Sequence, residues 1–239
     1  MGSFEKKKDA AKAYEQGKRI LEDSNLKIDK LEKIASKYTL SYQKIVLLMN
    51  LRDNGMYIAS PIYIYARYFR YYLSASEYLT FDREDLFYYA GRRIMRRGGH
   101  LFVAEYGMQT SVISRYGIRP FAVKDRDYRF INGDDSDFRY SNIEIINPYH
   151  GVLRIGEYGK YRYKALLHTR GNYIIGVYDT PEEAAIAYNK AVDFAHKAGI
   201  TKDYPVNYLE NVPPYTYAEI YDGTSLSPKL LSYFDSCKA

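Results

Sequence analysis

Four arginines lie within six residues of each other and form a dense group of positive charge. They are Arg92, Arg93, Arg96 and Arg97. Because guanidinium groups form charge-assisted, often bidentate, hydrogen bonds to phosphate, this group predicts contact with a nucleic-acid backbone. We place the arginines at the end of a helix over Arg83–Arg97 that Asp82 caps and Gly98-Gly99 ends. Stabilisation of that helix end by positive charge is the alternative explanation.

Histidine is scarce, which limits the catalytic chemistry available to the chain. The four histidines are His100, His150, His168 and His196. A metal-dependent nuclease needs a histidine base beside a divalent cation that histidine or carboxylate holds. His100 with Asp134 and Asp137 is the arrangement that we retain as an alternative to a non-catalytic protein.

Composition predicts one or two domains, and its positive balance fits nucleic-acid binding as well as other roles. The chain has 239 residues, a net charge of +6, 29 tyrosines and no tryptophan. Tyrosine either packs half-buried or contacts bases and phosphates. The single cysteine, Cys237, excludes a disulfide within the chain and favours the reducing cytoplasm. No apolar run approaches the roughly 20 residues of a membrane span.

Residues 151–208 predict a small sheet followed by one helix. The strand candidates are Gly151–Gly156, Tyr161–Thr169 and Tyr173–Tyr178, with Gly171 and Asn172 in the last turn because both tolerate positive φ.

The helix is predicted over Pro181–Ala198. Thr180 and Glu183 form a capping box, Pro181 suits the first helical position, and Gly199 ends the helix. Its apolar face consists of Ala184, Tyr188, Ala191, Val192 and Ala195, and the alanines allow a close approach to a sheet.

This stretch resembles the Apetala-two/ethylene-response-factor (ERF) DNA-binding domain, particularly the form that is fused to phage homing endonucleases. The most specific part is the run Gly176–Ala191; further matches are Gly151-Val152, Gly159-Lys160, Tyr163-Lys164-Ala165 and Val206-Asn207-Tyr208. The resemblance implies a three-stranded sheet in the DNA major groove with the helix packed behind it.

Strand alternation sorts the side chains between the two faces of that sheet. Tyr163, Ala165 and Leu167 are expected to face the helix. Leu153, Leu166 and Ile174 are expected on the DNA side, where the family places arginines and a tryptophan. The DNA contacts predicted for this domain are Arg154, Lys160, Arg162, Lys164, His168, Arg170 and Asn172.

The runs Asp127–Asp134 and Asp137–Ile143 resemble the core of the His-Asn-His (HNH) nucleases. Arg129 and Phe130 stand where that family has histidines, and Phe138 replaces its central asparagine. Phenylalanine neither accepts a proton nor binds a metal. We therefore predict a ββα unit that has lost catalysis. In it Asn132, Gly133 and Asp134 form the turn, and Arg139 and Asn142 hold the helix start or contact phosphate.

Residues 31–52 resemble a helix-turn-helix motif. A helix is predicted over Leu31–Tyr38 and a second over Tyr42–Arg52, with Ser41 as its N-cap. As a recognition helix, the second would present Tyr42, Gln43 and Lys44 to the major groove. A plain helical hairpin is the alternative, because the almost wholly apolar run Ile45–Met49 suits a buried helix.

These patterns together predict an α+β protein of four segments. They are a helical region that includes the helix-turn-helix-like stretch (1–99), the HNH-like ββα segment (100–148), the ERF-like domain (149–210) and a tail with one short helix at Pro228–Phe234 (211–239).

The predicted function is sequence-selective binding of double-stranded DNA without catalysis, cofactor or metal. The order of the two resemblances predicts a cytoplasmic transcriptional regulator of a phage, plasmid or integrative element, derived from an HNH homing endonuclease. A residual metal-dependent endonuclease and a protein-interaction module that uses the open sheet face are the alternatives. A homodimer is compatible with each of these functions, and no membrane partner is expected.

Overall fold

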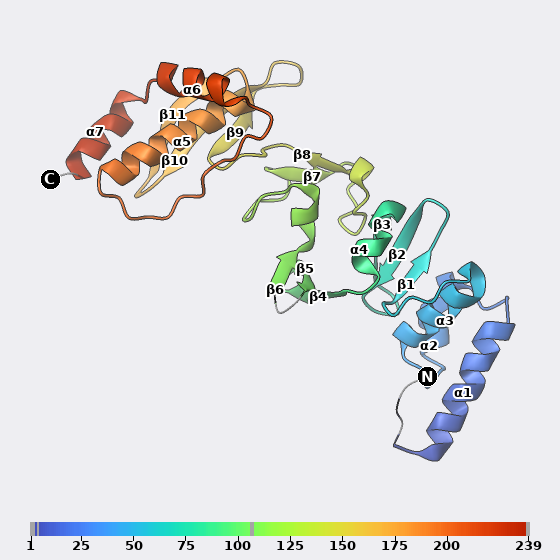
Figure 1. Cartoon of the computed structure of the whole chain (residues 1–239). Helices are drawn as coiled ribbons and strands as arrows, with labels where there is room; N and C mark the ends of the chain where they lie inside the picture. The colour runs from blue at the N-terminus through green and yellow to red at the C-terminus, as the bar shows by residue number, and fades with distance from the viewer. Residues whose placement is uncertain (1–2, 4, 106–107, 238–239) are drawn as a thin grey trace. The chain divides into compact units, whose positions relative to one another are not determined.

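The computed structural model describes residues 3, 5–105 and 108–237, which fold into two compact units (Figure 1). Unit 1 comprises residues 1–116 and 130–144, and unit 2 comprises residues 117–129 and 145–239. Helices combine with small antiparallel sheets, so the predicted α+β class is confirmed. The HNH-like segment is divided between the two units, and the four-segment organisation stays a prediction.

Unit 1 consists of an N-terminal helical group and two three-stranded sheets, β1-β2-β3 and β4-β5-β6. Its helices are α1 Lys7–Glu22, η1 Ile28–Lys30, α2 Leu31–Ala35, α3 Tyr42–Asn54, η2 Arg83–Asp85, α4 Leu86–Tyr89, η3 Val112–Tyr116 and η4 Tyr140–Asn142. Its strands are β1 Ile62–Ile64, β2 Tyr68–Tyr72, β3 Tyr78–Asp82, β4 Arg93–Arg97, β5 His100–Glu105 and β6 Met108–Ser111. A two-stranded sheet of β7 Tyr128–Phe130 and β8 Ile143–Ile145 follows.

The helix α3 is the centre of the N-terminal core. Ser41 caps it as predicted, and its side chain accepts a hydrogen bond from the Lys44 backbone N–H. Residues 45–50 are all buried, because α1, α2 and β1 pack around this helix. Burial on several sides explains why the run Ile45–Met49 is apolar throughout, and it favours the helical-hairpin alternative over a free recognition helix.

The predicted helix over Arg83–Arg97 is wrong. The chain instead forms η2 and the short α4, turns at Gly91, and continues as the strand β4. Ile94 pairs with Val103 on β5, and both side chains are buried. Gly98 and Gly99, with φ of +54° and +81°, make the β4–β5 hairpin turn. Hairpin pairing with β5 and burial of Ile94 outweigh the helical features of this segment.

Asp82 does not cap a helix through its side chain. Its carboxylate Oδ2 instead accepts the backbone N–H of Tyr140 at 2.7 Å. Asp82 therefore ties the end of β3 to η4.

Unit 2 is built on the antiparallel sheet β11-β10-β9. Its elements are β9 Val152–Ile155, β10 Arg162–His168, β11 Asn172–Tyr178, α5 Pro181–Lys197, α6 Pro214–Gly223 and α7 Pro228–Cys237. The three predicted strands and the helix are confirmed to within a few residues. The predicted position of the turn, at Gly171 and Asn172, is wrong by one residue. The turn spans residues 169–171, and Asn172 is already paired with His168 in β11.

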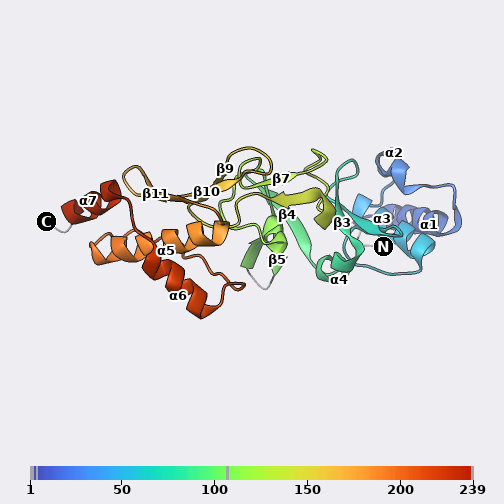
Figure 2. The same cartoon turned by 90° about the horizontal axis from the view of Figure 1, so that it is seen from above.

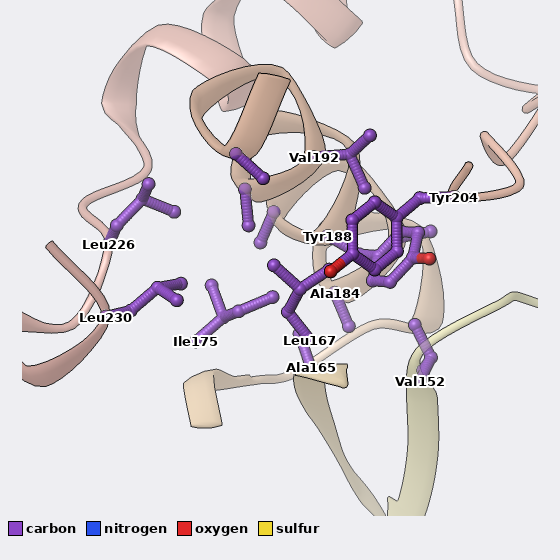
Figure 3. Close-up of a cluster of buried hydrophobic side chains, with 14 of the residues drawn as sticks. Val152, Ala165, Leu167, Ile175, Ala184, Tyr188, Val192, Tyr204, Leu226 and Leu230 are labelled. Carbon is purple, nitrogen blue, oxygen red and sulfur yellow. The ribbon is translucent and has the colours of Figure 1, made fainter. Parts of the chain in front are cut away.

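The alanine face of α5 packs on one face of this sheet. Ala165, Leu167 and Ile175 are buried against Ala184, Tyr188, Ala191 and Val192 (Figure 3). Both hydrogen bonds of the predicted capping box between Thr180 and Glu183 are present. Gly151 has a φ of +68°, and a Cβ there would lie 2.1 Å from the Tyr188 ring. A side chain at residue 151 would therefore force the helix and sheet apart.

A bulge in β11 keeps both ends of the strand on the core. Ala165 pairs with Gly176 and Leu166 pairs with Ile174, so Ile175 is the extra residue. Ile175 points into the core, where Figure 3 shows it beside Leu230. After the bulge the alternation resumes, and Val177 is exposed on the opposite face.

The C-terminal residues are part of the unit 2 core rather than a tail. The predicted short helix is present as α7, and Leu230 and Phe234 from this helix are buried with Leu226 in the α5 cluster. The helix α6, which the sequence did not predict, lies with α5 on the same side of the sheet (Figure 2). The expectation that one helix covers the sheet is therefore wrong, because α7 extends the same layer.

Leu230→Ala is expected to destabilise unit 2 by about 2–5 kcal/mol, the usual cost of this truncation in a core. The neighbouring Leu231, 38% exposed, is the matched control, and Leu231→Ala is expected to cost less than about 1 kcal/mol. Urea unfolding followed by tyrosine fluorescence measures both. Equal effects of the two substitutions would mean that α7 does not dock on the core.

Candidate nucleic-acid interface

The sheet face that points away from α5 is defined here as the open face. The register places on it Leu153 and Ile155 from β9, Arg162, Lys164, Leu166 and His168 from β10, and Asn172, Ile174 and Val177 from β11. The predicted sorting of side chains between the two faces is confirmed. Ile174 is 53% and Val177 39% exposed, so the apolar centre of this face remains accessible.

Lys164 lies at the centre of the open face. It is paired with Leu153 on one neighbouring strand and Val177 on the other. Arg162 shares the face and forms an ion pair with Asp179, whose carboxylate lies 3.0 Å away. Because this pair is largely exposed, it contributes little stability, and the guanidinium can exchange its partner for a phosphate.

A polar group closes the other end of the open face. The His168 Nδ1 and the Asn172 Oδ1 lie 2.7 Å apart. The ammonium of Lys202, which follows α5 in the sequence, donates to the backbone carbonyl of His168 at 2.8 Å. These contacts fix the His168 and Asn172 side chains at the edge of the apolar centre.

The remaining predicted contacts of unit 2 do not belong to the open face. Strand alternation places Arg154 on the face of the sheet that points toward α5, because it pairs with Tyr163. Its guanidinium lies 4.4 Å from the centre of the Tyr161 ring. Lys160 is exposed in the loop between β9 and β10, and Arg170 is exposed in the turn between β10 and β11. Lys160 and Arg170 thus extend beyond opposite ends of β10.

The predicted contacts of unit 1 converge in part. Tyr42, Gln43, Arg92 and Arg93 line one pocket of about 500 Å³. The hydroxyl of Tyr42 donates to the carbonyl of Leu73 at 2.6 Å, so it serves the fold. Lys44 is half-buried beside them on α3.

The four arginines do not form one patch. The guanidinium of Arg92 stacks on the Tyr88 ring, 4.3 Å from its centre. Arg93 and Arg97 share one face of β4, whereas Arg96 faces the other way and forms an ion pair with Glu77. The four side chains therefore do not share one helical face, because strand geometry separates residues that a helix would have grouped, and their contact with phosphate stays a prediction.

The HNH-like segment forms an aromatic core at the positions that the resemblance assigns to catalytic groups. Phe130 and Phe138 are buried, with ring centres 5.4 Å apart. Phe138 also stacks on Phe81 of β3 and lies beside Tyr116. The predicted ββα unit is wrong: η4 and β8 follow β7, and residues 117–180 contain no α-helix. These aromatic contacts bind the segment to β3.

A hydrogen-bonded loop connects Phe130 to Phe138. The Asn132 N–H donates to the Asn142 Oδ1 at 2.8 Å, and the Asn142 amide donates to the carbonyl of Asp137 at 2.8 Å. Gly133 turns the chain with a φ of +79°, as predicted. Arg139 donates through Nε to the buried Asp137 carboxylate at 2.8 Å. Asn142 and Arg139 therefore hold the loop.

Burial alone would raise the pKa of Asp137. The hydrogen bonds and charge of Arg139 outweigh burial and hold that pKa below its ordinary value of 3.8. The ionised carboxylate is therefore stabilised by folding. Its contribution is complete above the unfolded-state pKa and is lost as the pH falls through the folded-state pKa.

Sequence reasoning missed a group of cations beside the open face. Arg119, Arg126 and Lys202 line a pocket of about 580 Å³ together with the open-face residues Leu166 and His168. Arg119 and Arg126 both form ion pairs with the fully buried Asp127. Asp127 was assigned to the HNH-like motif, and only its folded position links it to Arg119.

The described residues contain no cluster of three or more His, Cys, Asp or Glu side chains arranged to hold a metal ion. His100, Asp134 and Asp137 therefore do not assemble into a ligand set there. Among the helices that the structure describes, none combines the length and apolarity needed to cross a membrane. No protein family, curated protein or solved structure matches this chain.

Asp137→Asn is expected to destabilise unit 1 by about 1–3 kcal/mol at pH 7, because it removes a charge-assisted acceptor. The loss in the free energy of unfolding, relative to the unsubstituted protein, is expected to shrink as the pH falls below 3.8. Urea unfolding at several pH values measures it. Glu84→Gln, at an exposed carboxylate of the same unit, is the control. A deficit that does not change with pH would contradict the assignment.

Proposed function

We propose that this protein binds double-stranded DNA and that the open face of the β9–β11 sheet enters the major groove. The observation that carries the proposal is Lys164, which stands at the centre of an accessible face between apolar side chains. A cation placed there gains more from a phosphate or a base edge than from water alone.

The dimensions of the sheet suit the groove. Neighbouring strands lie about 4.8 Å apart, so three strands span about 10 Å, and the major groove is about 12 Å wide. The loop and turn at the ends of β10 carry Lys160 and Arg170, which are exposed. Phosphates on the groove walls are natural partners for these two cations.

The side chains of the open face support selectivity between sequences. Lysine pairs with the O6 and N7 atoms of guanine, asparagine pairs with adenine, and apolar groups contact the thymine methyl. Lys164, Asn172 and Ile174 provide one side chain of each type. We therefore extend the proposal to sequence-selective binding.

The order of the two resemblances supports a mobile-element origin. An HNH-like segment precedes an ERF-like domain, as in phage homing endonucleases, and an aromatic core fills the former catalytic positions. Within the proposal, the protein is a cytoplasmic transcriptional regulator that retains the DNA-binding part of such a nuclease.

Lys164→Ala is expected to change the preference between duplex sequences, because each base-reading contact contributes about 1–3 kcal/mol of discrimination. Arg170→Ala is expected to weaken binding to all sequences alike and to lower the salt slope by about 0.9. Fluorescence anisotropy on selected and scrambled duplexes distinguishes the two effects. Lys229→Ala, an exposed cation on α7, is the control. Unaltered preference after Lys164→Ala would place base reading elsewhere.

A residual nuclease is the alternative that the HNH-like motif raises. Because Phe130 and Phe138 occupy the positions of the base and the central asparagine, we expect no cleavage. Supercoiled plasmid incubated with the protein and Mg²⁺ or Mn²⁺ is expected to remain intact. Nicking that disappears in Asp134→Ala would contradict this expectation and establish an enzyme.

The exposed Ile174 and Val177 favour a second candidate, a protein-interaction face. The salt dependence of binding separates the two, because DNA binding strengthens as the salt concentration falls. Failure to bind random-sequence duplex at low salt would remove the DNA proposal and leave the protein partner.

A further inference from the structure

The pocket beside the open face, defined here as the edge pocket, joins three kinds of residue. Leu153, Leu166 and His168 come from the open face, and Arg119, Arg126 and Lys202 come from segments outside the sheet. Val152, Tyr188 and Tyr204 come from the core between the sheet and α5. All of these residues belong to unit 2. A molecule lying on the open face therefore has a cationic pocket immediately beside it.

Arg119 is held in a fixed position within unit 2. Its side chain is 13% exposed, and its NH2 group lies 3.0 Å from the Asp127 Oδ1. The backbone N–H of Val123 also donates to Asp127, at 2.8 Å. The buried Nε of Arg119 has no hydrogen-bond partner in the structure. A buried donor without an acceptor costs about 1–3 kcal/mol, which an oxygen ligand would recover.

The charges around the edge pocket favour a monoanion. Arg119, Arg126 and Lys202 provide three positive charges, and the buried Asp127 and the lining Asp203 provide two negative charges. The excess is one positive charge, which matches the single negative charge of a phosphodiester, whereas free phosphate is a mixture of monoanion and dianion at neutral pH. Burial and the charge of Arg119 lower the pKa of the lining His150, so its neutral form is favoured.

Phe121 adds an aromatic group to the lining. Phe121 is 90% exposed and lines the pocket. Its backbone φ of +63° lies in the left-handed region. A bulky residue held in that conformation carries strain that the surrounding loop must offset. An exposed ring beside a phosphate pocket is suited to stack on the sugar or base next to that phosphate.

We propose that the edge pocket binds one phosphodiester group of the DNA backbone, with Arg119 and Arg126 as its main ligands and Lys202 beside them. The assignment rests on the proposed function, since the pocket borders the face that we place in the groove. It fixes which side of the sheet meets a DNA strand: the β9 side.

The Arg119 Nε–H resonance reports on the pocket directly. Arg119→Lys retains the charge and lacks this group, so it identifies the resonance in a ¹⁵N-labelled spectrum of the full chain. The resonance is expected to move when short duplex DNA or dimethyl phosphate is added. Inorganic phosphate is expected to have a weaker effect, because its dianionic fraction does not match the single excess charge.

The salt dependence of DNA binding provides the second measurement. Arg126→Ala and Lys202→Ala are each expected to lower the slope of log K against log salt, by no more than about 0.9, the value for complete loss of one phosphate contact. Lys229→Ala, the matched loss of one exposed charge, is expected to leave the slope unchanged. Arg126→Lys, which retains the charge, is expected to retain most of the slope.

The outcomes separate the pocket from the proposed function. Duplex binding with a stationary Arg119 resonance and unaltered slopes would overturn the pocket assignment while the DNA proposal stands. If inorganic phosphate moves the Arg119 resonance and duplex DNA does not, the pocket binds free phosphate. That result would overturn the proposal of a phosphodiester ligand. Absence of duplex binding would refute the proposed function, and the dimethyl phosphate titration would still decide whether the pocket takes a diester.

Discussion

Close packing of α5 on the β9–β11 sheet is the interaction on which the proposed interface depends. Alanines on the helix and a glycine at residue 151 allow the approach, and Tyr188 lies against that glycine. Because one face of the sheet is fully used by this contact, strand alternation sends Lys164 and Ile174 to the other face. Burial of Leu230 from α7 in the same cluster extends the support beyond one helix. A rigid, supported sheet can present side chains to a groove without reorganising.

The segment that resembles an HNH core is held together by aromatic packing and hydrogen bonds. Phe138 packs between Phe81 and Phe130, and Asn142 and Arg139 hold the loop that leads to it. Buried aromatic pairs contribute about 0.5–1.5 kcal/mol each beyond the burial of their surface. The segment therefore has a structural role of its own in unit 1, which is independent of any reaction.

The sequence was most informative where local signals were strong and agreed with each other. The capping box at Thr180 and the alternation along β10 predicted the helix and the open face correctly. The prediction for residues 92–97 was wrong because Gly98-Gly99 was interpreted as the end of a helix, whereas these glycines form the two-residue turn of the hairpin that pairs β4 with β5. The cations of the edge pocket escaped notice for a different reason: Arg119 and Lys202 lie far apart in the sequence, and the buried Asp127 has no local signal.

Methyl NMR of the full chain during titration with duplex DNA tests the central claim most directly. The groove-binding arrangement predicts that the methyl resonances of Leu153, Ile174 and Val177 move, whereas those of Val192 and Leu230, which are buried behind the sheet, stay in place. If the open-face methyl resonances stay unchanged at low salt when duplex DNA is saturating, the groove-binding arrangement is contradicted.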